Sequence, residues 1–148
     1  MRAVALLVWL MVAGSAFAQV AGGAAEGVTG TTPQDRSAIQ GVINHQLDAF
    51  LRDDAAGAYS FAAPNVREIF PTPEIFIDMV RRGYRPVYRP ATREFSELAQ
   101  RDGDLVQEVE LTGPDGKPVL ALYTMRKSAD GTWQIAACVL IASARVGV

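Results

Sequence analysis

Three short turn sequences divide the second half of this chain into four segments of strand length. Asp102-Gly103, Pro114-Asp115-Gly116 and Asp130-Gly131 all use residues that favour tight turns between antiparallel strands. Apolar and polar residues alternate in the segments that they separate, which cover residues 93–100, 105–111, 119–126 and 133–142. The sequence therefore predicts an antiparallel meander of about four strands.

Helical patterns come before these strands. Thr32-Pro33-Gln34-Asp35 combines an N-cap, a proline at the first helical position and the acid of a capping box. Apolar residues then recur at helical spacing from Ile39 to Phe50, which predicts an amphipathic helix ending near Arg52. We expect a second, shorter helix after Asp53-Asp54, interrupted by Pro64.

A further helix is predicted between Thr72-Pro73-Glu74, which repeats the first start signal, and Gly83, which ends it. From Tyr84 onward the apolar period changes from helical to two. Helices first and an antiparallel sheet afterwards predict an α+β fold. We expect a single α+β domain over residues 32–148, with N-terminal helices packed on a curved sheet.

The first residues have the pattern of an export signal. Arg2 precedes an uncharged apolar run over residues 3–13, and Ala16-Phe17-Ala18 is a cleavage site of the small-x-small type. We expect cleavage after Ala18 and a flexible leader over residues 19–31. The protein is then expected to be periplasmic or secreted, with no transmembrane segment in the mature chain.

Composition limits the chemistry. The formal net charge of −2 gives no reason to expect a nucleic-acid partner. The single cysteine, Cys138, lies in an apolar run and is expected to be a buried hydrophobe. The single histidine, His45, is expected to face solvent. We therefore predict no metal site and no cofactor.

Two motifs resemble a known family. Residues 58–64, Ala-Tyr-Ser-Phe-Ala-Ala-Pro, and residues 79–90, from Met79 to Pro90, are similar to the proteobacterial family domain of unknown function 4864. The order of elements resembles the nuclear-transport-factor-two-like, or SnoaL-like, superfamily. That resemblance implies a cone-shaped, cystatin-like fold with a pocket between helices and sheet, but no particular activity.

An Arg-Tyr segment follows the last predicted helix, and its guanidinium groups could bind an anion at the mouth of the cone. Alternatively, these arginines pair with Glu94, Glu97 or a helix C-terminus. The candidate rim residues are Tyr84, Arg85, Tyr88 and Arg89, within a cluster that also contains Arg81, Arg82 and Arg93.

Two candidates point towards the cone itself. Gln46 interrupts the apolar stripe of the first helix, so its amide either ties that helix to the sheet or enters the pocket. Tyr59 lies on a helix expected to pack near the interior. Asp48 and Asp78 offer carboxylates, but no spacing compels an acid–base pair, so the catalytic residues stay undetermined.

The last strands carry apolar residues on both predicted faces. Strict alternation groups Trp133 and Ile135 with Val139 and Ile141 on one face. Leu120, Leu122, Ala136, Cys138 and Leu140 are expected on the other face. A second apolar face needs a cover, which a homodimer would supply.

We therefore expect a non-enzymatic binding module for a small apolar or anionic ligand. The alternatives are an isomerase- or hydratase-like enzyme using a Tyr and an Asp, or a structural envelope protein assembling through its sheet face.

Overall fold

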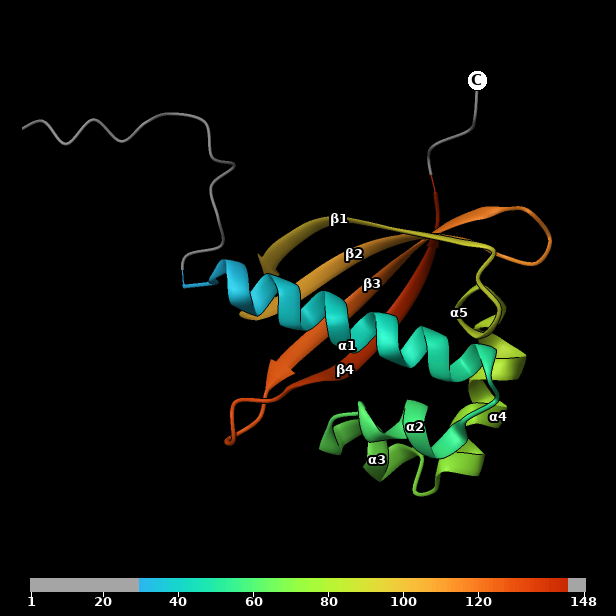
Figure 1. Cartoon of the computed structure of the whole chain (residues 1–148), viewed down its shortest axis with the longest axis horizontal. Helices are drawn as coiled ribbons and strands as arrows, with labels where there is room; N and C mark the ends of the chain where they lie inside the picture. Colours follow the sequence, from blue (N-terminus) through green and yellow to red (C-terminus); the bar gives the residue numbers. More distant parts are fainter. Residues whose placement is uncertain (1–29, 144–148) are drawn as a thin grey trace, which may run out of the picture.

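The computed structural model describes residues 30–143 and combines five helices with one four-stranded antiparallel sheet (Figure 1). The predicted signal peptide, and the predicted leader up to residue 29, lie outside the described residues. The α+β class is confirmed. The helices are α1 (Pro33–Leu51), α2 (Ala55–Ser60), α3 (Pro64–Ile69), α4 (Pro73–Gly83) and α5 (Arg85–Tyr88). The strands are β1 (Thr92–Arg101), β2 (Asp104–Thr112), β3 (Pro118–Lys127) and β4 (Trp133–Ala142).

Helix α1 begins with the predicted capping box. The Thr32 hydroxyl accepts from the Asp35 amide at 3.0 Å, and the Asp35 carboxylate accepts from the Thr32 amide at 3.1 Å. The same carboxylate accepts from Lys127 Nζ at 3.0 Å and from Trp133 Nε1 at 3.2 Å. One acidic side chain thus caps the helix and joins it to the hairpin between β3 and β4.

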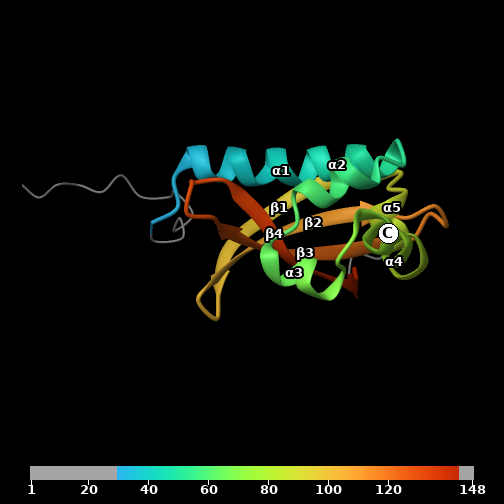
Figure 2. The ribbon, with the colours of Figure 1, turned by 90° about the horizontal axis from the view of Figure 1, so that it is seen from below.

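The core lies between α1 and one face of the sheet (Figure 2). Ile39, Ile43, Leu47 and Phe50 are all fully buried on the helix, as the helical spacing predicts. Burying side chains of this kind contributes about 1.5–3 kcal/mol each to the free energy of unfolding. His45, on the opposite side of the helix, is exposed as expected.

Two register shifts bend the sheet around this helix. The first lies in β1 between Phe95 and Leu98. There the buried Gln107 amide donates to the Glu97 carbonyl at 3.2 Å, and so satisfies a carbonyl that regular pairing would have used. The second shift lies in β4, where Ile135 and Ala137 pair with consecutive residues of β3 and Ala136 has no Cα partner.

The shift in β4 overturns the predicted grouping of the strand residues. It places Cys138 opposite Tyr123 on the inner face, together with Trp133 and Ile135. Val139 and Ile141 pair with Leu122 and Leu120 on the outer face instead. One extra residue inverts strict alternation along the rest of a strand, so the sequence pattern alone gives the wrong faces.

The segment after α4 also differs from the prediction, because residues 85–88 form a helical turn where a period of two was expected. Pro86 occupies the first turn of α5, where its missing amide costs no hydrogen bond. The turn directs Tyr84 and Val87 inward and Arg85, Tyr88 and Arg89 towards another surface. In an extended strand, successive side chains would point to opposite faces, and residues of these two sets would share a face.

The described residues provide no helix that is long and apolar enough to cross a membrane. The same residues contain no group of three or more His, Cys, Asp or Glu side chains arranged to hold a metal ion.

We predict that Asp35→Asn destabilises the protein at pH 7 and reduces its sensitivity to acid. The hydrogen bonds from Thr32 and the ammonium of Lys127 lower the pKa of Asp35 well below its usual 3.8. A lowered pKa adds stability above pH 3.8, and that stability is lost as the pH falls further towards the folded-state pKa. Urea unfolding between pH 2 and pH 7 measures the difference.

The matched control is Asp102→Asn. Asp102 has the same side chain but makes no hydrogen bond or ion pair within residues 30–143. Equal acid sensitivity of the two variants would show that Asp35 does not hold α1 to the hairpin.

Candidate functional site

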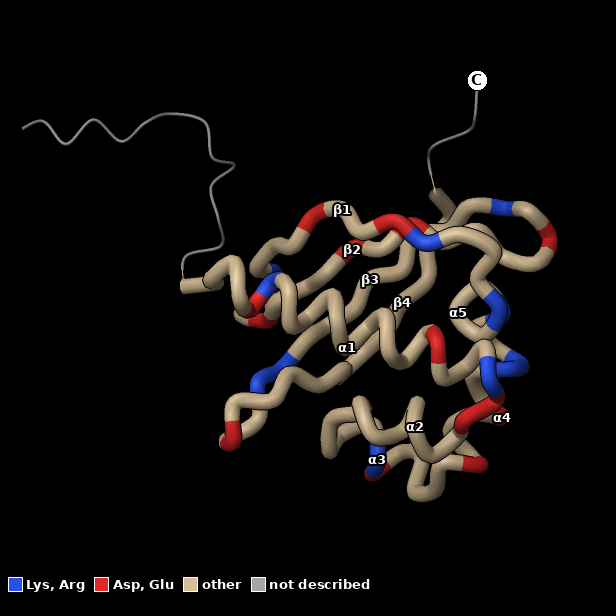
Figure 3. The backbone as a smooth tube through the Cα atoms, in the orientation of Figure 1, with Lys and Arg blue, Asp and Glu red and all other residues tan. Residues whose placement is uncertain are grey.

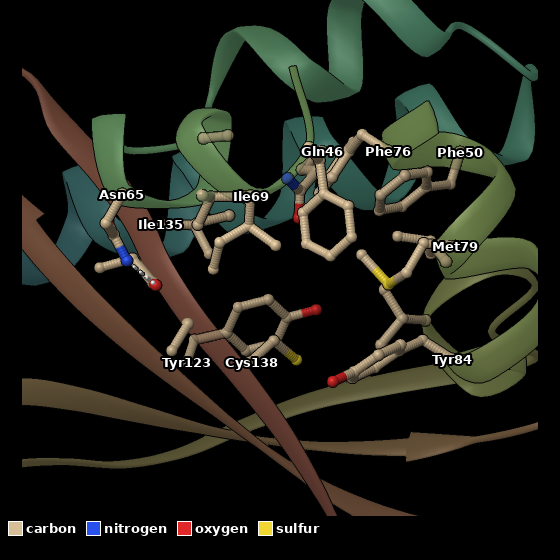
Figure 4. Close-up of a pocket in the computed structure, with 17 residues that line it drawn as sticks. Gln46, Phe50, Asn65, Ile69, Phe76, Met79, Tyr84, Tyr123, Ile135 and Cys138 are labelled. Carbon is tan, nitrogen blue, oxygen red and sulfur yellow. Dashed lines mark hydrogen bonds between the residues drawn. The ribbon is translucent and has the colours of Figure 1, made fainter. Parts of the chain in front are cut away.

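A cavity of about 240 Å³ lies where the helices meet the β4 side of the sheet (Figure 4). Helices α1, α3, α4 and α5 contribute to its wall, and strands β3 and β4 close it from the other side. Ile69, whose surface is 68% exposed, stands at its border with solvent. The cavity is therefore a pocket between helices and sheet, in the position that the resemblance implied.

The wall is mainly apolar and aromatic. Phe50 and Phe76 contact each other with ring centroids 6.0 Å apart, and Met79 borders the same space. No Asp, Glu, Lys, Arg or His side chain of the described part of the chain lines the cavity. A wall of this kind favours an uncharged ligand, because a charge placed there would lose its hydration without gaining a counter-ion.

Tyr123 brings the most unusual polar group to this wall. Its side chain is fully buried, and its hydroxyl makes no hydrogen bond to any described residue. In Figure 4 the hydroxyl points away from β3 towards Met79 and Tyr84. Buried hydroxyls nearly always have a partner, so an unpaired one beside a cavity indicates a place for a ligand's polar atom.

Asn65 adds a second polar group. Its Nδ2 donates to the Ala136 carbonyl at 2.8 Å, which is the carbonyl of the residue left out of the β4 pairing. Its Oδ1 is buried and has no partner among the described residues. An unpaired acceptor and an unpaired hydroxyl therefore lie just behind the cavity wall.

Burial controls the acidity of the two titratable groups that face each other here. It raises the pKa of Tyr123 well above 10.0, and the neighbouring Cys138 raises it further. Burial also raises the pKa of Cys138 to about 12, although the Tyr123 hydroxyl lowers it slightly. The thiol and the hydroxyl are close enough for a weak hydrogen-bond interaction to contribute to both pKa shifts, but the Tyr123 hydroxyl does not reach the geometry of a full hydrogen bond. Both groups are neutral at physiological pH, so Cys138 is no thiolate nucleophile.

Gln46, predicted for the pocket, and Tyr84, predicted for the rim, both line the cavity, whereas Tyr59 does not. Gln46 is buried and its Nε2 donates to the Ala58 carbonyl at 3.1 Å, so it ties α1 to α2 rather than to the sheet, and it also borders the cavity. Tyr59 packs behind Phe76 with ring centroids 5.6 Å apart, and its hydroxyl donates to the Phe70 carbonyl at 2.6 Å.

The predicted rim residues Arg85, Tyr88 and Arg89 lie together on a different surface, which is lined by none of the cavity residues. Arg89 also forms an ion pair with Asp53 at 3.0 Å. Arg93 pairs with Asp48 at 2.9 Å on α1 rather than with Glu94 or Glu97. The Arg-Tyr segment and the cavity are therefore two separate features.

The candidate acids also lie outside the cavity. Asp48 and Asp78 pair with Arg93 and Arg82 respectively. Of the Asp53-Asp54 pair, only Asp54 caps α2, accepting from the Gly57 amide at 2.9 Å. Asp53 adopts a φ of 53° and accepts from Tyr88 and Arg89.

Asn65 and Tyr123 are polar cavity residues that the sequence analysis did not single out. Asn65 directly follows Pro64, at the start of a six-residue helix that the sequence indicates only weakly. Its partner, the Ala136 carbonyl, depends on the irregularity in β4, and no local pattern of the sequence announces that irregularity.

The chain belongs to the family described as Domain of unknown function (DUF4864), which matches residues 32–148. The match covers every described helix and strand. No curated protein and no solved structure showed significant similarity to the chain.

We predict that Tyr123→Phe stabilises the ligand-free protein. Removing a buried hydroxyl that lacks a partner removes a desolvation cost of about 1–3 kcal/mol. Tyr59→Phe makes the same chemical change where the hydroxyl is bonded, and we expect it to lower the free energy of unfolding by about 1 kcal/mol. Urea unfolding of both variants measures whether each change raises or lowers the free energy of unfolding. A loss of stability in both variants would contradict the account of Tyr123.

Proposed function

We propose that this domain binds a small, uncharged and largely apolar molecule that carries one hydroxyl or carbonyl group. The proposal is supported above all by the unpaired hydroxyl of Tyr123 at the wall of an uncharged cavity. An apolar wall favours the body of such a ligand, and a few polar groups orient it. Asn65 Oδ1 would accept from a ligand hydroxyl in the same way.

The size of the cavity limits the ligand. At about 240 Å³ it is slightly smaller than the range of roughly 300–1,000 Å³ that is usual for drug-sized ligands. A single substituted ring suits this volume. Because the Tyr123 hydroxyl lies behind the cavity surface, contact with it requires a neighbour to move, and Met79 is the flexible side chain towards which it points.

We favour binding over isomerase or hydratase chemistry. Such chemistry needs a carboxylate and a hydroxyl that converge on one substrate. Tyr123 supplies a hydroxyl, but within residues 30–143 no carboxylate lines the cavity.

We keep assembly into a homodimer as a second candidate on one observation. On the outer sheet face, Val139 and Ile141 are 52% and 45% exposed, beside the paired Leu122 and Leu120. A second copy of the chain would cover this apolar strip. We also retain export to the periplasm or medium, and membership of the nuclear-transport-factor-two-like superfamily, as proposals.

Native mass spectrometry of protein purified from a periplasmic fraction tests export and assembly together. We expect a mature chain beginning at Gln19 and a complex of two copies. An unprocessed chain would contradict export, and a single copy at micromolar concentration would contradict the dimer.

Three probes that share a methyl-substituted benzene ring test the proposed ligand class, namely 4-methylphenol, toluene and 4-methylbenzoate. We expect 4-methylphenol to bind most tightly and the benzoate anion most weakly, because the cavity offers a hydrogen bond but no counter-ion. Tyr123→Phe should weaken 4-methylphenol binding about three- to tenfold and leave toluene binding unchanged. Protein-observed NMR titrations measure all affinities, and preferred binding of the benzoate would refute the proposal.

Two exposed isoleucines provide a matched control for the position of the site. Ile69 borders the cavity, whereas Ile75 on α4 is 50% exposed and does not line it. Ile69→Glu should weaken 4-methylphenol binding, and Ile75→Glu should not. Equal effects would place the binding elsewhere.

A further inference from the structure

A second concavity, of about 270 Å³, lies beside α5 on the surface. Its lining residues are Arg81, Arg85, Tyr88, Arg89 and Pro114, and we call this set the Arg rim. Figure 3 shows the basic positions gathered around the end of α4 and α5. The Arg rim shares no residue with the apolar cavity, so a ligand of a different chemistry could occupy it.

The charges of the Arg rim are not balanced by its neighbours. Arg82 and Arg93, the other arginines of the segment, are turned to Asp78 and Asp48 and are not part of the rim. Of the three arginines that remain, only Arg89 pairs with a carboxylate, that of Asp53. Two positive charges are therefore left over.

The two other arginines form no ion pair with a described residue, although Asp53 and Asp78 attract Arg81 electrostatically. The Arg85 side chain is exposed and makes no hydrogen bond or ion pair with any described residue. Arg81 donates through Nε to the Tyr88 hydroxyl at 3.3 Å, which is a neutral partner. Both guanidinium groups thus keep most of their donors for a ligand.

The centre of the Arg rim is rigidly built. Arg89 donates from Nη2 to both Asp53 oxygens at 3.0 Å, and from Nη1 to the Phe50 carbonyl at the end of α1. The Tyr88 ring lies 3.9 Å from the Arg89 guanidinium carbon and 5.5 Å from that of Arg81. Cation–π contacts of this kind fix both guanidinium groups before any ligand arrives.

We propose that the Arg rim is an anion site for a compact phosphate-class group carrying at least two negative charges. Arginine forks match the geometry of phosphate oxygens and bind them through paired, charge-assisted hydrogen bonds. A dianion would compensate the two uncompensated charges, and a concavity suits a compact group better than an extended chain. This site goes beyond the proposed function, since it uses neither the cavity nor its residues.

A purely structural role is the competing explanation, because arginines near the C-terminus of α4 interact favourably with the helix dipole. Arg85 separates the two explanations. Arg85 lies outside α4, and its backbone carbonyl accepts from the Arg89 amide at 2.9 Å, but its side chain has no bonding partner in the described residues. Truncating that side chain therefore removes no structural contact. An anion site, in contrast, requires it.

Isothermal titration with inorganic pyrophosphate at low ionic strength tests the site. We expect binding that weakens with added salt, and a loss of about tenfold or more in affinity for Arg85→Ala, without a change in melting temperature. The control Arg82→Ala removes an identical charge three residues away that is outside the Arg rim, and we expect less than about a threefold loss. Equal losses in the two variants would overturn the proposal, because they would indicate a diffuse charge effect.

The source of the phosphate group is distinguished by a second arm. Sedimentation with vesicles of phosphatidic acid and phosphatidylcholine, compared with phosphatidylcholine alone, reports on lipid headgroups that carry a terminal phosphate. Arg85-dependent binding of pyrophosphate alone supports a soluble ligand, and Arg85-dependent binding of the anionic vesicles supports a headgroup. Failure of the wild-type protein to bind either probe refutes the anion site, whatever the apolar cavity binds.

Discussion

Helix α1 is held against the concave face of the sheet at both of its ends, and the rest of the structure depends on this attachment. At its start, Asp35 bonds Lys127 and Trp133 of the last hairpin. Towards its end, Asp48 pairs with Arg93 of β1, and the Phe50 carbonyl accepts from Arg89. These contacts hold α1 over the buried face of the sheet, which includes Tyr123. Helices α2, α3 and α4 lie together on the β4 side of the sheet (Figure 1). The cavity lies where these later helices meet the strand.

The cavity departs from the usual rules of a protein core. A core is close-packed, and its polar groups are bonded. Here two buried polar atoms, Tyr123 Oη and Asn65 Oδ1, stay unpaired beside a space that side chains do not fill. A local violation of this kind is expected where function opposes stability. Gln107 differs in its place rather than in its bonding: its amide nitrogen bonds carbonyls at the β1 register shift, and its Oε1 also lacks a partner among the described residues but does not border the cavity.

The sequence predicted the fold better than the site, for a physical reason. Caps, prolines and Asp-Gly turns act locally, so the limits of α1, α4 and the four strands were readable from short patterns. Gln46 was also readable, because a polar residue on an apolar stripe stands out. The extra residue at Ala136 is set by pairing between distant strands, and it decides which β4 side chains face the cavity. Asn65 and the turn of α5 depend likewise on contacts across the fold.

The central claim is that Tyr123 holds its hydroxyl for a ligand. A crystal structure of the protein with 4-methylphenol tests this most directly. The account predicts the phenol inside the cavity, with its oxygen about 2.7–2.8 Å from Tyr123 Oη. Two results would contradict the account. In the first, the phenol is bound elsewhere; in the second, it is in the cavity but the Tyr123 hydroxyl donates to a protein atom instead of contacting it.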